Sequence, residues 1–135
     1  MKTKKIDYIF AIGRRKESSA RVRLYRGKAE NTVNGMPAAK YFPGELALKM
    51  MAKPFGATET SDKHFFSAKV AGGGKEGQLG ALVLAISRSL VKVAPEKNKL
   101  VLKKLGLLTR DSRIRQRRMV GKGGKARRAK QSPKR

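Results

Sequence analysis

The sequence predicts an α+β domain that is followed by an extended basic tail. The first half of the chain holds short segments rich in β-branched and aromatic residues, which favour strands. The second half holds a long apolar repeat with helical spacing, and the last 26 residues show neither pattern. We expect residues 1–109 to form one domain and residues 110–135 the tail. A body of this size can bury roughly two-thirds of its unfolded surface.

Two early segments predict a β-hairpin. Residues 6–13 are β-branched and aromatic, and residues 19–25 alternate strictly between apolar and polar side chains. The alternation directs the apolar side chains to one face, and it directs Arg21, Arg23 and Tyr25 to the other.

The tip of this hairpin is basic. We expect it to consist of Arg14, Arg15 and Lys16, with Glu17 as the only nearby acid. Together with the outward arginines of the second strand, the tip predicts one continuous basic surface.

Further elements follow from apolar spacing and from the positions of proline and glycine. We expect a strand at 29–33, a helical turn at 37–42, a helix at 45–53 stopped by Pro54, a strand at 63–71, and helices at 76–93 and 95–104. The long helix at 76–93 is expected to bury Leu79, Leu82, Val83, Ile86, Leu90 and Val93. Predicted core residues on the other elements are Leu46, Met50, Met51, Phe65, Leu100, Val101 and Leu105. On the long helix, we expect Ser89 to face away from the core with its charged neighbours.

The run Gly72–Gly77 formally matches G-x-G-x-x-G between a strand and a helix. The match is weak as a dinucleotide signature, because three successive glycines satisfy it easily and no parallel strand is evident before it. Two interpretations stay open. The glycines allow a tight turn, or the loop and Lys75 meet a phosphate at the start of the helix.

Composition excludes several function classes. The net charge is +25 and there is no cysteine, so disulfides and thiolate metal sites are absent and a reducing, cytoplasmic compartment is expected. No transmembrane span or signal peptide is evident. We find no catalytic motif, and with His64 as the only histidine we expect no metal or cofactor. No aromatic residue follows Phe66, and no set of aromatic residues on a sheet is evident.

The tail predicts a polyanionic partner. It holds 12 lysines and arginines against the single acid Asp111, with too few apolar residues to order itself. Eight of the 12 are arginines, which suit bidentate phosphate contacts. Fully extended, it could span roughly 85–95 Å. Folded RNA is the favoured partner. A DNA-compacting protein is the alternative, and a nucleotide-dependent enzyme or a membrane-surface protein fits the sequence less well.

Several motifs then resemble one family. They are G-R-R-K at 13–16, A-R-V-R-L at 20–24, V-N-G at 33–35, Y-F at 41–42, G-G-G with G-Q-x-G-A through residue 81, G-L-L-T-R-D-x-R at 106–113, A-R-R-A at 126–129 and the terminal K-R. The chain resembles the bacterial-type small-subunit ribosomal protein S-nine over nearly its whole length. The resemblance implies a ribosomal-protein-S5 domain-2-like fold, a sheet with helices packed on one side.

The resemblance also implies partners and binding residues. It implies docking on 16S rRNA in the head of the small subunit, beside other head proteins, with a tail reaching the anticodon stem-loop of the peptidyl-site tRNA. We expect rRNA contacts from Arg14, Arg15, Lys16, Arg21, Arg23, Lys75, Arg110, Arg113, Arg115, Arg117, Arg118, Lys122, Lys125, Arg127 and Arg128. The tRNA contact falls on Lys134 and Arg135. Ser132 and Pro133 replace the aromatic-Ser pair usual in the family, which removes a ring next to that contact.

Overall fold

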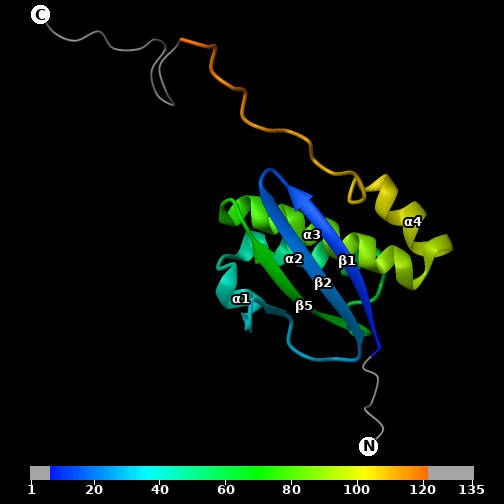
Figure 1. Cartoon of the computed structure of the whole chain (residues 1–135). Helices are drawn as coiled ribbons and strands as arrows, with labels where there is room; N and C mark the ends of the chain where they lie inside the picture. Colours follow the sequence, from blue (N-terminus) through cyan, green and yellow to red (C-terminus); the bar gives the residue numbers. More distant parts are fainter. Residues whose placement is uncertain (1–6, 122–135) are drawn as a thin grey trace, which may run out of the picture.

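A five-stranded mixed sheet with helices packed on one face forms the body of the protein (Figure 1). The structure is a computed structural model and describes residues 7–121. In chain order the elements are β1 (Tyr8–Arg15), β2 (Ser18–Arg26), β3 (Thr32–Val33), β4 (Met36–Pro37), α1 (Ala38–Tyr41), α2 (Glu45–Ala57), β5 (His64–Ala71), α3 (Lys75–Val93) and α4 (Pro95–Lys104). The α+β class predicted from the sequence is confirmed.

The sheet contains one parallel pair. Its strands lie in the order β1-β2-β5-β3-β4, and neighbours pair antiparallel except β3 and β5. α1 and α2 form the crossover between these two parallel strands. The expectation that no parallel strand precedes the glycine run is therefore wrong. β3 covers only the last two residues of the strand expected at 29–33, and local spacing gives no signal of its parallel pairing with β5.

The β1–β2 hairpin has a tighter tip than the sequence predicts. Arg14 and Arg15 pair with the first residues of β2 inside the ladder, so the turn consists of Lys16 and Glu17 alone. The strands extend this far because buried and exposed residues keep alternating up to the turn. Arg14 and Arg15 consequently face opposite sides of the sheet.

α2 is longer than predicted and runs through a proline. It continues past Pro54 to Ala57. An internal proline removes one helical hydrogen bond and crowds the preceding turn. Here Pro54 and Phe55 are both buried, and the Phe55 ring stacks on Phe66 with 6.1 Å between centroids. Burial of this last turn against the sheet outweighs the local preference to stop.

The core lies between the sheet and the helices, and several residues predicted for it are only half-buried or exposed. Phe66 is buried and Phe65 only half-buried, because β5 alternates from Phe66 onward. On α2, Met51 is buried as predicted, Met50 is half-buried, and Leu46 is 72% exposed.

α3 and α4 have nearly the predicted spans, but their buried faces differ in detail. Ser89 is buried rather than exposed, and its hydroxyl donates to a backbone carbonyl three residues earlier at 2.7 Å. On α4 the buried residues are Asn98 and Leu102, whereas Leu100 and Leu105 are exposed. A short helix that contacts the core along a narrow stripe leaves apolar residues outside it, and spacing alone does not identify which ones.

α3 lies directly on the hairpin because Gly13 has no side chain. A Cβ at this position would collide with the carbonyl oxygen of Ala81 and would lie 2.6 Å from the backbone nitrogen of Ala85. Both atoms belong to the backbone of α3, so neither can rotate away. The glycine therefore sets the distance between β1 and the helix.

We expect Gly13→Ala to lower the free energy of unfolding by about 1–3 kcal/mol, because the added methyl group must displace a helix backbone. Gly56→Ala in the last turn of α2 is the matched control, since a Cβ there meets nothing within 4 Å. It should be neutral or stabilising by up to about 1 kcal/mol. Urea unfolding of the full chain, followed by circular dichroism, measures both. Equal stabilities would contradict the close packing.

Candidate nucleic-acid interface

Exposed cations lie on the face of the sheet that the helices leave open. Arg21 and Arg23 are exposed there as predicted, and Lys69 of β5 lies directly opposite Arg21. Alternation puts Arg14 on the same face, at the hairpin end of β1. Part of the predicted basic surface therefore exists. It is not continuous with Arg15, which faces the helices.

Arg15 runs along α3 instead of projecting from a hairpin tip. Its side chain crosses α3 at Gly80, where a Cβ would collide with it and would lie 2.9 Å from its Nη1. The side chain is 27% exposed, and its Nη2 lies 3.4 Å from a carboxylate oxygen of Asp111. The expectation that Glu17 is the only nearby acid is therefore wrong, because the start of the tail brings a second one.

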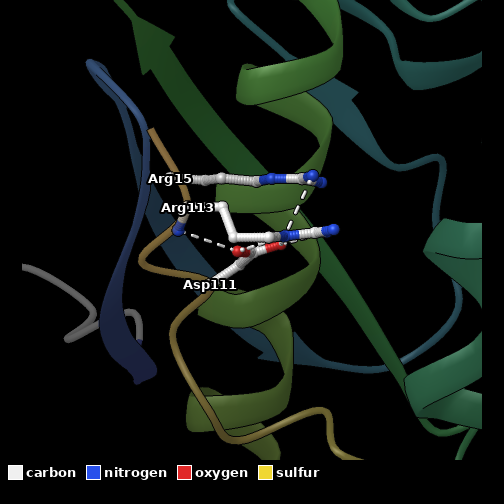
Figure 2. A network of polar contacts seen from close by, with 3 residues as sticks. All are labelled: Arg15, Asp111 and Arg113. Atoms are coloured by element: carbon white, nitrogen blue, oxygen red, sulfur yellow. Dashed lines mark hydrogen bonds and ion pairs between the residues drawn. The ribbon is translucent and has the colours of Figure 1, made fainter. Parts of the chain in front are cut away.

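Asp111 fastens the base of the tail to the hairpin (Figure 2). Its carboxylate accepts hydrogen bonds from the Arg113 Nη2 at 2.7 Å and from the Arg113 Nε and backbone N–H at 3.0 Å. The same carboxylate also forms an ion pair with Arg15. The sequence analysis predicted neither contact of Asp111. For the contact with Arg113, the Asp-x-Arg spacing is a local signal, since an aspartate can accept a hydrogen bond from the N–H two residues further on.

These contacts change the acidity of Asp111. Hydrogen bonds from the Arg113 side chain and then from its backbone N–H hold the pKa of Asp111 well below its ordinary value of 3.8. The charge of Arg15 acts in the same direction as the smallest cause. The ionised carboxylate is therefore the form that these contacts favour.

Beyond Asp111 the tail leaves the body without helix or strand as far as residue 121 (Figure 1). Its apolar residues Ile114, Met119 and Val120 are at least 75% exposed. The predicted rRNA-binding residues Arg113, Arg115, Arg117 and Arg118 lie in this stretch and Arg110 just before it, and all five are exposed. Outside the described residues lie Lys122, Lys125, Arg127, Arg128, Lys134 and Arg135.

The glycine run forms a tight turn that packs on the hairpin. The Ser18 hydroxyl donates to the Gly72 carbonyl at 2.9 Å, and the Gln78 side-chain amide donates to the same oxygen at 3.1 Å. Gly73 has a φ of 60°, and a Cβ on it would collide with the Ser18 hydroxyl. The first of the two interpretations of the glycines, a tight turn, is thus present in the structure.

Lys75 contacts α1. Its Nζ lies 3.4 Å from the centroid of the Tyr41 ring and donates to the Tyr41 carbonyl at 3.1 Å. The Tyr41 hydroxyl in turn donates to Gln78 at 2.8 Å. These contacts join the end of α1 to the first turn of α3.

Three segments that are distant in sequence enclose a basic hollow of about 790 Å³. The hairpin turn, the glycine loop and the base of the tail each form part of its wall. Its lining residues are Arg15, Lys16, Glu17, Gly73, Gly74, Arg113, Ile114 and Arg115. The hollow also adjoins the start of α3, whose first amides have no partner within the helix. Cations, backbone amides and the positive end of a helix are the groups that bind phosphate.

Other chemistry is not evident between residues 7 and 121. This part of the chain holds no group of three or more His, Cys, Asp or Glu residues arranged for a metal ion. His64 is half-buried, and its Nδ1 has no hydrogen-bond partner. Within the same range no helix is long and apolar enough to cross a membrane.

The open sheet face also carries aromatic rings, which the sequence analysis did not anticipate. Tyr8, Tyr25 and Phe65 are directly opposite one another on β1, β2 and β5. Ring centroids are 5.8 Å apart between the first two and 5.2 Å apart between the last two. The expectation of no aromatic set on a sheet is wrong, because strand register unites residues that the sequence separates.

Comparison with known proteins identifies the family. The sequence model of a family described as "Ribosomal protein S9/S16" matches residues 13–135. The chain belongs to this family. The small ribosomal subunit protein uS9 of Leifsonia xyli subsp. xyli is 46% identical over 125 residues, which cover 93% of this chain and 74% of the relative. The uS9 proteins of Arthrobacter sp. and Renibacterium salmoninarum are 43% and 42% identical with the same coverage.

The match to the S9/S16 family covers the whole basic hollow, from Gly13 through the hairpin turn and the glycine loop to the tail. The family resemblance drawn from the sequence motifs is confirmed. Proteins of this family are ribosomal proteins, a structural and non-enzymatic kind.

In the Arg113→Gln variant we expect the pKa of Asp111 to rise towards its ordinary value of 3.8, because the largest cause of the lowering is removed. Arg15→Gln, the matched control, should raise it less. Since the pKa is lower in the folded state, the contact stabilises the fold above the ordinary pKa. This contribution is lost as the pH falls towards the folded-state pKa. NMR of the Asp111 carboxyl carbon against pH measures both variants. A larger effect of Arg15→Gln would refute the assignment.

Proposed function

We propose that this chain is a structural component of the small ribosomal subunit of the cytoplasmic ribosome, where it binds 16S rRNA in the head beside other head proteins. The observation that carries the proposal is the basic hollow between the hairpin turn, the glycine loop and the base of the tail. The relatives named small ribosomal subunit protein uS9 support the same conclusion.

Phosphate binding at the hollow follows from its charge and shape. The hollow is lined by Arg15, Lys16, Arg113 and Arg115 and by one acid, Glu17, while Asp111 pairs with Arg15 and Arg113. The first-turn amides of α3 add hydrogen-bond donors that have no partner within the helix. In this proposal, RNA phosphates enter between the turn and the tail and hold the body in a defined orientation.

Asp111 gives the hollow its geometry. By holding Arg113 and facing Arg15, it keeps the start of the tail next to the hairpin before RNA binds. A preorganised wall lowers the entropic cost of binding. Arg14, Arg21 and Arg23 on the open face, Lys75 beside the glycine loop, and the tail cations from Arg110 onward extend the rRNA contact.

The tail extends the contact beyond the body. Its exposed arginines neutralise phosphates as it passes along RNA, and counterions are released as they do. The final residues Lys134 and Arg135 contact the anticodon stem-loop of the peptidyl-site tRNA in this proposal, which rests on the resemblance of the terminal Lys-Arg pair.

If the full-length protein neutralises about 6 phosphates of a folded fragment of the 16S 3′ major domain, log affinity should fall with log salt with a slope of magnitude ~4–5. Lys16→Gln should lower this magnitude by ~0.7, because one phosphate contact is lost. Lys28→Gln, beyond the opposite end of β2, is the charge-matched control and should leave the slope unchanged. A slope near zero, or tighter binding of duplex DNA in competition, would favour another function.

Deletion of Lys134 and Arg135 should weaken retention of peptidyl-site tRNA while leaving subunit incorporation nearly intact, because the other cations still dock the protein. Filter binding of tRNA to purified small subunits measures the first quantity, and co-sedimentation measures the second. Deletion of Lys2 and Lys4 removes the same charge at the other end and serves as the control. Loss of incorporation without loss of tRNA binding would reassign these two residues to rRNA docking.

A further inference from the structure

The face of the sheet opposite the helices is uncovered by the described residues, yet it carries large apolar side chains. Tyr8 is 45% exposed, Phe10 40% and Ile12 37%. α3 packs on the other face of the same strands, and Figure 1 shows the helices behind β1, β2 and β5. A solvated sheet face usually alternates to polar residues, so rings at these positions indicate a partner.

Three of the rings form a row across the strands. Tyr25 stacks on Phe65 with an interplanar angle of 17° and 5.2 Å between centroids. Tyr8 continues the row on β1, with its ring 5.8 Å from that of Tyr25 and tilted to it by 56°. Phe10 lies two residues along β1 from Tyr8 and therefore on the same face. Ring contacts already restrain Tyr8 and Tyr25, so a planar ligand that stacks on Tyr8 would cost little further side-chain entropy.

Cations surround the rings and indicate the charge of the partner. Arg23 lies opposite Phe10, and its guanidinium is 5.0 Å from the centroid of the Tyr8 ring. Arg21 lies two residues from Arg23 on β2, towards the hairpin turn, and Lys69 of β5 lies opposite it. Arg14 lies on the same face at the hairpin end of β1. A purely apolar patch would suit a protein partner. Rings interleaved with cations match a ligand that carries flat bases on an anionic backbone.

We infer that this face binds unpaired RNA nucleotides, with bases on Tyr8 and Phe10 and phosphates beside Arg21 and Arg23. The inference rests on the proposed function in taking RNA as the partner. The spacing favours unpaired nucleotides. Tyr8 and Phe10 are about 6.7 Å apart along the strand, whereas stacked bases rise about 3.4 Å. Consecutive bases can contact both rings only when they are unstacked from each other.

The first test measures the fluorescence of the tyrosines on this face. The chain has three tyrosines and no tryptophan, and two of the tyrosines lie on this face. In full-length Tyr41→Phe protein, tyrosine fluorescence therefore reports on the face alone. We expect a single-stranded uridine decamer to quench this fluorescence. A fully paired RNA duplex of equal length should quench it about fivefold less, or less still. If fluorescence anisotropy shows that the decamer binds and the tyrosines are not quenched, the inference fails.

The second test separates stacking from charge. Phe10→Leu keeps an apolar side chain but removes a ring, so affinity for the decamer should fall about fivefold or more at every salt concentration, with an unchanged salt slope. Ile12→Leu, on the same strand and face, is the matched control and should change affinity less than twofold. Arg23→Gln should instead lower the slope by ~0.7.

Two outcomes would overturn the inference while leaving the proposed function intact. One is that Phe10→Leu leaves affinity for the decamer unchanged, while the 16S fragment still binds with a steep salt slope. The other is that Phe10→Leu binds both RNAs normally but competes poorly with wild type for incorporation into small subunits. That result would assign the face to a neighbouring protein. Thermal unfolding of each variant checks that the fold is kept, as the exposure of Phe10 leads us to expect.

Discussion

The rest of the structure depends on the close contact between α3 and the β1–β2 hairpin. Gly13 removes the side chain that would separate them, and Gly80 leaves the space through which Arg15 crosses the helix. Ser18 bonds to the glycine loop and so holds the start of α3 against the hairpin turn. The packing that forms the core therefore also brings the cations of the turn to the positive end of α3. The hollow is a consequence of this contact.

The single acid of the tail acts on geometry more than on stability. A chain with a net charge of +25 repels itself, and a basic segment leaving near Arg15 would be driven away from the hairpin. Asp111 reverses this locally by facing Arg15 and by binding the side chain and backbone of Arg113. Exposed ion pairs contribute little to folding free energy. The multiple contacts instead set the direction in which the tail begins.

Features with a local cause were predictable from the sequence. α4 begins at Pro95 and ends before Gly106 as predicted, because proline suits the first helical turn and glycine the residue after the last. The alternation of β2 likewise identified its buried and exposed faces. Where tertiary packing competes with local preference, prediction failed. Pro54 lies inside α2 because its burial outweighs the lost hydrogen bond.

Contacts between distant segments had no local signal at all. Tyr8, Tyr25 and Phe65 form a row only because the register of three strands aligns them. Asp111 meets Arg15 because the chain returns from α4 to the hairpin end. The basic residues themselves were visible in the sequence. The place of Arg15 in the hollow was not, because the expected hairpin tip left Arg14 and Arg15 outside the paired strands, where the pleat would not separate them.

Two neighbouring residues join the two surfaces of the hairpin. The pleat of β1 directs Arg14 to the open face and Arg15 to the helix side, so one strand end contributes a cation to each. Their surroundings differ in the chemistry they offer. The hollow presents cations and amides without a ring, which suits phosphate contacts that set orientation. The open face adds rings beside cations, the combination that we infer to contact unpaired bases. Under this inference, an RNA that follows the hairpin around its turn would meet phosphate contacts on one side and base contacts on the other.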